Sequence, residues 1–195
     1  MKKICVFSFA VVMFLGMTMM AGATVLDFDT LAGGGAKIPN GYGGLNWSAD
    51  FDSLNGDTYG GSGYNLGTIS HPNVVYNGNA YDVNVSSVGT ATGPFTFNGA
   101  YFTAAWDTAL NIGIKGYLGG AELFSTTVVA NNQGPIYASL NWSGIDTLYF
   151  TSNANGGSQF VMDNFTYNAV PLPGALWLLG PGLMGLAAIR RRFKK

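Results

Sequence analysis

The sequence predicts an all-β protein whose body is a two-sheet β-sandwich of the jelly-roll kind. Between Thr24 and Asn168, no apolar spacing of helical period lasts three turns, and short alternating runs recur between Gly, Asn, Asp and Pro. Aromatic residues make up 14% of the chain, charged residues only 10%, and Gly numbers 29, which is typical of strands joined by tight turns. The 195 residues leave room for one such domain plus short targeting segments.

Ten short runs between turn signals are the expected strands. They are Val25–Asp29, Leu45–Phe51, Val74–Tyr76, Tyr81–Val88, Phe95–Thr103, Leu110–Leu118, Glu122–Val129, Ile136–Trp142, Asp146–Phe150 and Gln159–Tyr167. A β-helix is the structural alternative, but no fixed repeat supports it.

Strand alternation also predicts which side chains share a face, because every second residue points the same way. On one strand, the expected shared face carries Phe95, Phe97, Gly99 and Tyr101. On the last strand, it carries Val161, Asp163, Phe165 and Tyr167.

The formal net charge of −1 hides a segregation of charge along the chain. Seven of the nine basic residues lie at the two ends, and only Lys37 and Lys115 lie between them, together with all ten acids. Residues 24–168 therefore carry a formal charge of −8. This argues against nucleic acid as a partner, because neutralising phosphates requires clustered Lys and Arg.

Residues 1–23 have the three parts of a secretory signal peptide. Lys2 and Lys3 precede an apolar run, which ends at the small-residue site formed by Ala21 and Ala23 around a glycine. We expect cleavage after Ala23, with an uncleaved membrane anchor as the alternative. The single cysteine, Cys5, leaves with the signal peptide, so the mature chain depends on core packing without disulfides.

The C-terminus resembles a second targeting segment. Residues 169–174 contain a proline-rich motif, and the uncharged stretch 172–189 is about 27 Å long as a helix, just enough to span a bilayer. The tail 190–195 is basic, which predicts that it stays in the cytoplasm and that the body lies outside the inner membrane. A simple tail anchor, or a buried helix of the body, is the alternative.

This arrangement resembles the PEP-CTERM sorting signal of Gram-negative bacteria, in its VPLPA-type variant. The resemblance rests on two groups of residues: Val170, Pro171, Leu172, Pro173 and Gly174, then Arg190, Arg191 and Arg192. The resemblance implies an exosortase as processing partner and delivery to the cell surface or beyond. Leu172 stands where the acidic residue of the type motif stands, and Gly174 replaces the Ala of the variant.

The body also resembles secreted jelly-roll proteins of unassigned function. The residues that carry this resemblance are the early segment Gly41–Trp47 and the late pair Asp163-Asn164. The resemblance implies a fold and no activity.

Catalytic chemistry is poorly supplied, so we expect no catalytic residues and no enzyme activity. Glu122 is the single glutamate and His71 the single histidine, whereas a glycosidase needs two carboxylates and a triad needs a base beside its nucleophile. His71 is expected to be a turn residue beside Pro72, and no second His or Cys completes a soft-metal site in the mature chain.

Aromatic residues near Asn, Asp or Gly are the better candidates for ligand binding, because sugar rings pack on aromatic faces. The candidates are Tyr42, Trp47, Tyr59, Tyr64, Trp106 and Trp142. Tyr59 and Tyr64 are expected to be the exposed pair of a polar loop. The alternative for the tryptophans is a place in the core.

Calcium is the one cofactor that the sequence suggests. Asp27, Asp29 and Asp163 lie near the two ends of the body, where a jelly roll brings its terminal strands together, and Ca²⁺ requires oxygen ligands. Ordinary hydrogen bonding at turns and strand ends is the alternative.

These observations favour an exported surface or matrix protein with a structural or adhesive role in an exopolysaccharide or biofilm matrix. A carbohydrate-binding module is the alternative, and a polysaccharide-active hydrolase is the weaker third interpretation.

Overall fold

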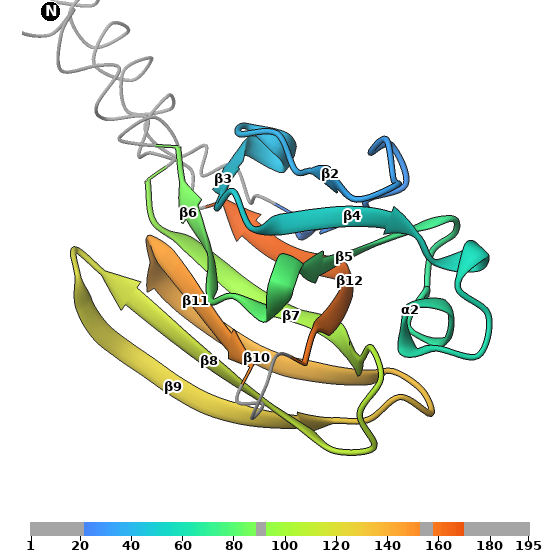
Figure 1. Cartoon of the computed structure of the whole chain (residues 1–195). Coiled ribbons are helices and arrows are strands. Elements are labelled where there is room, and N and C mark those ends of the chain that lie inside the picture. The colour runs from blue at the N-terminus through green and yellow to red at the C-terminus, as the bar shows by residue number, and fades with distance from the viewer. Residues whose placement is uncertain (1–21, 89–92, 153–157, 170–195) are drawn as a thin grey trace, which may run out of the picture. The chain divides into compact units, whose positions relative to one another are not determined.

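Two antiparallel sheets pack face to face, and the predicted two-sheet, jelly-roll-like β-sandwich is confirmed (Figure 1). The computed structural model describes residues 22–88, 93–152 and 158–169. These residues belong to one compact unit, Gly22–Val170.

The larger sheet, called sheet A here, has the strand order β10-β7-β12-β5-β4-β2, with β1 also paired to β12. Its strands are β1 (Thr24–Leu26), β2 (Ala36–Lys37), β4 (Phe51–Asn55), β5 (Asn73–Asn77), β7 (Phe95–Ala104), β10 (Ile136–Ile145) and β12 (Phe160–Ala169).

The smaller sheet, sheet B, has the order β3-β6-β11-β8-β9. Its strands are β3 (Leu45–Trp47), β6 (Val83–Ser87), β8 (Leu110–Leu118), β9 (Ala121–Ala130) and β11 (Thr147–Ser152). Short helical turns join some of the strands: η1 (Tyr42–Gly44), η2 (Gly56–Thr58), α2 (Gly63–Leu66) and η3 (Gly78–Ala80).

The core between the sheets is rich in aromatic residues. Buried rings contact one another within sheet A and between the sheets: Phe97 meets Phe165 of the same sheet at 4.8 Å, and Trp47 of sheet B meets Phe51 of sheet A at 5.2 Å between ring centroids. Aromatic side chains bury 150–250 Å² each, and such ring pairs add about 0.5–1.5 kcal/mol beyond area burial.

The predicted shared faces of β7 and β12 are wrong, because each strand changes phase at an irregular residue. On β7, Phe97 faces the core but so does Ala100, with Gly99 at φ +156° between them, which turns Tyr101 to the outer face of sheet A. On β12, the register shifts after Asp163 and Asn164 has φ +50°, so Val161 and Asp163 lie on the opposite face to Phe165 and Tyr167. A bulge of this kind places one extra residue in a strand and inverts the alternation beyond it.

Two predicted strands also have different boundaries in the structure. The expected strand Leu45–Phe51 is two strands in different sheets, β3 and β4, because the chain crosses between the sheets at residues 48–50. The expected strand Val25–Asp29 ends at Leu26, and Phe28 follows with the left-handed φ of +62° while its ring stays fully buried.

Both predicted targeting segments fall largely outside the described residues. Ala23 is described and exposed, whereas Ala21, the motif 170–174, the predicted span 172–189 and the tail 190–195 are not described. Within the described ranges, no helix has the length and apolar character needed to cross a bilayer.

Candidate functional site

Trp47 and Tyr42 belong to the core and its border rather than to a binding surface. Trp47 is 4% exposed and its ring contacts Phe28, Phe51 and Phe165. Its indole Nε1 donates to the backbone oxygen of Tyr42 at 3.0 Å. The ring of Trp47 therefore offers no face for a ligand, and the core alternative holds for this residue.

The segment Gly41–Trp47 is a tight turn followed by strand β3, and it positions these rings. Gly41, Gly43 and Gly44 all have left-handed φ values, between 61° and 88°, which glycine adopts at little cost. The Tyr167 hydroxyl donates to the backbone oxygen of Gly43, which ties the turn to β12. The structure thus gives this segment a role in holding the core together.

Tyr59 and Tyr64 have opposite environments. Tyr59 is 44% exposed, as expected, but the prediction that Tyr64 is exposed is wrong: it is 4% exposed and packs with Leu54, Val74, Ala105 and Val161. Burial raises the pKa of Tyr64, and its hydroxyl donates to Gln159 Oε1. Tyr64 is therefore the anchor of its loop.

Asp163 fastens that same loop to sheet A. Its carboxylate, fully buried, accepts from the backbone N–H groups of Ile69 (2.7 Å) and Ser70 (2.9 Å) and from the Ser70 hydroxyl (3.1 Å). Burial raises the pKa of Asp163 to about 6, and the hydrogen bonds from Ser70, Ile69 and Asn164 oppose that rise.

Asp27 and Asp29 contact the end of the same loop that Asp163 holds. The calcium hypothesis requires these three residues to lie close together. The Ser70 hydroxyl also lies 3.0 Å from the backbone oxygen of Asp27, and Asp29 Oδ1 accepts from Asn73 N at 3.0 Å. No group of three His, Cys, Asp or Glu residues within the described ranges is placed to hold a metal ion. A calcium ion bound by Asp27, Asp29 and Asp163 stays a prediction.

The outer face of sheet B carries a different set of side chains, arranged in rows across the strands. The register aligns Asn84, Tyr149, Lys115 and Ser125 in one row, and Thr151, Gly113 and Thr127 in the next. Leu148 and Phe150, the alternate residues of β11, face the core, so these rows point outward.

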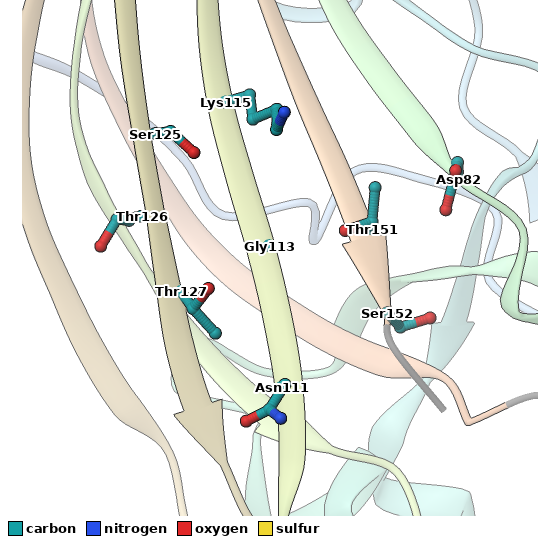
Figure 2. A pocket seen from close by; sticks show the side chains of 9 residues that line it. All are labelled: Asp82, Asn111, Gly113, Lys115, Ser125, Thr126, Thr127, Thr151 and Ser152. Atoms are coloured by element: carbon teal, nitrogen blue, oxygen red, sulfur yellow. The ribbon is translucent and has the colours of Figure 1, made fainter. Parts of the chain in front are cut away.

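A shallow hollow of about 470 Å³ lies on this face, centred on Gly113 (Figure 2). Its lining is polar: Asp82, Asn111, Lys115, Ser125, Thr126, Thr127, Thr151 and Ser152, besides Gly113. A Cβ atom at Gly113 would lie 2.5 Å from Thr151 Oγ1, so the missing side chain keeps the hollow open. Ligand sites are commonly 300–1,000 Å³ in volume.

An aromatic pair and an ion pair, formed by residues of β8, β9 and β11, lie beside the hollow. The rings of Tyr117 and Tyr149 meet edge to face at 6.1 Å, and Tyr149 is 40% exposed. Lys115 Nζ lies 2.9 Å from Glu122 Oε2, which also accepts from the Tyr117 hydroxyl at 3.2 Å. The hydrogen bond from Lys115 lowers the pKa of Glu122, and the same bond raises the pKa of Lys115. Both groups therefore stay charged at neutral pH.

The sequence alone did not predict this face, because its residues come together only through the pairing of neighbouring strands. Asn111, Lys115 and Thr151 are ordinary outward residues of β8 and β11, and only the register shows that they lie around one glycine. Gly113 in the middle of a predicted strand was the available signal, since glycine in a strand marks a bulge or a close approach.

Comparisons with known proteins give no family and no curated relative. No family model matches the chain, and no curated protein matches it. Solved structures with some similarity include the family 61 carbohydrate-binding module TmCBM61 in complex with β-1,4-galactotriose, at 13% identity and a TM-score of 0.41, covering 67% of this chain and 94% of that one.

Two further solved structures are the CBM22-1 xylan-binding domain of Paenibacillus barcinonensis Xyn10C and a family 29 carbohydrate-binding module. The first is 11% identical with a TM-score of 0.43, covering 80% of this chain and 99% of that one. The second is 12% identical with a TM-score of 0.42, covering 78% and 90%. Likenesses at these identities and TM-scores establish no family and no function for this chain.

Proposed function

We propose that the body is a non-catalytic carbohydrate-binding domain of an exported protein, and that the outer face of sheet B binds the glycan. The observation that carries this proposal is the open, polar hollow above Gly113 beside the Tyr117 and Tyr149 rings. Of the two main interpretations of the sequence, this favours carbohydrate binding over a structural role without a ligand.

The chemistry of the lining suits a sugar. Each sugar hydroxyl donates and accepts hydrogen bonds, and the hollow offers a carboxylate acceptor in Asp82, an ammonium donor in Lys115, and an amide with both functions in Asn111. The exposed ring of Tyr149 offers an aromatic face beside them for the C–H groups of a sugar. The strands of sheet B fix the backbone positions of Asn111, Lys115 and Tyr149, which reduces the entropy lost on binding.

The same lining argues against hydrolysis. A glycosidase places two carboxylates on opposite sides of the bond that it cleaves. Asp82 is the one carboxylate among the residues that line the hollow, and the neighbouring Glu122 is paired with Lys115. A non-enzymatic role therefore fits this face best.

Affinity electrophoresis of residues 24–169 through gels that contain β-galactan, xylan, hydroxyethyl cellulose or alginate tests the proposal. This fragment contains β1 to β12 and the whole described core. We expect retardation by a neutral glycan and none by anionic alginate, because the body carries a charge of −8.

Gly113→Val is the informative variant, because it fills the hollow and its Cβ displaces the Thr151 hydroxyl, with thermal unfolding as the check that the body stays folded. We expect at least about tenfold weaker binding, which corresponds to about 1.4 kcal/mol. Gly134→Ala is the matched control, since a Cβ there meets nothing within 4 Å. Equal binding by the Gly113→Val variant and the wild type would move the site elsewhere, and a wild type that no glycan retards would favour the purely structural role.

Export and sorting form a separate part of the proposal, supported by the sequence alone. We propose that an exosortase removes the tail near Pro171–Gly174 and that the mature body reaches the cell surface or the exopolysaccharide matrix. Mass spectrometry of surface protein from an exosortase-positive host should find no intact Phe193-Lys194-Lys195 terminus. An intact terminus there would identify the tail as a permanent anchor.

A further inference from the structure

Two exposed aromatic rings lie on the opposite side of the sandwich, around Tyr64. Trp106 is 59% exposed and its ring meets Tyr64 at 5.7 Å, while Tyr59 is 44% exposed and meets Tyr64 at 5.4 Å. The two distances place the rings of Trp106 and Tyr59 no more than about 11 Å apart. We call this pair the aromatic patch.

The aromatic patch is held firmly although its rings are exposed. The backbone oxygen of Trp106 accepts from Asn132 Nδ2 at 2.8 Å, and that of Tyr59 accepts from Ser62 N at 3.2 Å. The helical turn behind them packs directly on β7, since Gly63 N donates to Ala105 O at 2.8 Å and a Cβ on Gly63 would lie 1.7 Å from Ala104 O. The backbone that carries the two rings is therefore ordered before a ligand binds, and each ring also contacts the buried Tyr64.

The loop is also closed at its base by a contact between two polar side chains. His71 Nδ1 lies 2.7 Å from Asp57 Oδ1, and both side chains are exposed. Hydroxylated ligands can therefore form hydrogen bonds with groups on this loop. Asn132, which donates to the backbone oxygen of Trp106, offers further polar groups together with Gln133, and the two side chains bond to each other at 2.8 Å.

The surroundings select a neutral polysaccharide over other partners. A body with a charge of −8 repels nucleic acid and anionic lipid. Two aromatic side chains of about 150–250 Å² each, at 44% and 59% exposure, offer far less than the roughly 800 Å² that each partner buries in a stable protein interface. A sugar ring, by contrast, is small enough to pack on a single aromatic side chain, and successive sugars of a polysaccharide can pack on separate aromatic side chains.

The aromatic patch and the hollow lie on opposite outer faces. Val161, which packs with Tyr64, alternates with core residues Phe160 and Met162 of sheet A, whereas Tyr149 alternates with core residues of sheet B. We propose that the aromatic patch is a second glycan-binding surface and that one molecule links two polysaccharide chains. This inference rests on the proposed function of sheet B for its first binding surface.

Light scattering of residues 24–169 mixed with β-galactan, xylan or hydroxyethyl cellulose tests this inference, alongside the electrophoresis described above. The wild type should both bind and cross-link a neutral glycan. Trp106→Ala and Tyr59→Ala should abolish cross-linking, and should weaken binding to the patch about tenfold or more, while binding through the hollow persists. Gly113→Val should also abolish cross-linking and leave the residual binding of the patch.

Tyr137→Ala is the matched control, because Tyr137 is also 44% exposed but pairs with Tyr101 elsewhere on sheet A. It should leave cross-linking unchanged, and an equal loss there would show that the effect is not specific to the patch. Cross-linking that survives Trp106→Ala and Tyr59→Ala overturns the inference and leaves the hollow proposal intact. Unchanged binding by Gly113→Val, with complete loss in Trp106→Ala, would overturn the hollow and with it the linking of two chains, and would leave the patch as the glycan-binding surface.

Self-association is the competing explanation, and sedimentation velocity without glycan distinguishes it. We expect a monomer for the wild type and for every variant. A wild-type dimer that Trp106→Ala dissociates would show that the patch binds a second copy of the chain, which overturns the inference.

Discussion

The outer faces of the two sheets differ in what covers them. Sheet B leaves its outer rows open, so that Lys115, Tyr149 and Thr151 border a hollow. Sheet A carries a second apolar cluster on its outer face, beneath the loop that contains α2. The same strand alternation thus produces a free surface in one sheet and a buried layer in the other.

The difference shows that exposure in this fold depends on the loops rather than on the strands. The loop 56–72 is rich in glycine and polar residues, which is typical of an exposed, mobile segment. In the structure, glycine serves a different purpose: Gly63 and Gly67 let the loop approach Thr103 and Ala104 of β7 closely. Tyr64 and Asp163 then hold the loop in place.

The largest effect that tests this comparison is expected from two tryptophans. Trp47→Ala should destabilise the body by about 3–5 kcal/mol, because it leaves a cavity among Phe28, Phe51 and Phe165. Trp106→Ala should change stability by no more than about 0.5 kcal/mol, because its ring is exposed. Urea unfolding of both variants measures this difference, and similar losses would contradict the distinction between core and patch.

Asp163→Ala should have the next largest effect, about 2–4 kcal/mol. It removes the acceptor for Ile69 N, Ser70 N and the Ser70 hydroxyl at a partly buried junction between the loop and sheet A. Asp163→Asn keeps one acceptor oxygen and should cost less. Thermal unfolding measures both, and hydrogen exchange at residues 69 and 70 should increase first, because the loop opens from sheet A there. Unchanged exchange would show that Tyr64 alone holds the loop.

The fold class could be predicted from the sequence, because it depends on local alternation and turn signals. The faces of β7 and β12 could not, since one bulge at Gly99 or Asn164 inverts every later residue. The hollow on sheet B depends even more on register. In the loop 56–72, Tyr59 was correctly expected to be exposed, but the burial of Tyr64 was not expected. Trp106 and Gly113 gain their roles only from strands and loops distant in sequence.

The pH dependence of stability should show a smaller effect of the same carboxylate. The native pKa of Asp163 is raised to about 6, above its ordinary value of 3.8, so the native state binds a proton where the unfolded chain has lost it. Protonation of Asp163 therefore stabilises the native state fully below about pH 4. This stabilisation, about 1–3 kcal/mol of the free energy of unfolding, is lost as the pH rises to about 6. Asp163→Asn should remove this slope in urea unfolding, and a slope that persists would assign it to other groups.

Calcium should have the smallest effect, and it acts on the same junction between the loop and sheet A. If Asp27, Asp29 and Asp163 bind the ion, free Ca²⁺ at ten times its Kd stabilises the body by about 1.4 kcal/mol. For a domain of this size, that is a rise of about 3–5 °C in Tm relative to chelator. Asp27→Asn should reduce the rise without changing the Tm in chelator, because, among the described residues, the Asp27 side chain accepts only from the N–H of Asp29, at 3.3 Å. An equal Tm with calcium and with chelator would leave the hydrogen bonds of Asp163 as the full explanation of how the loop is fastened.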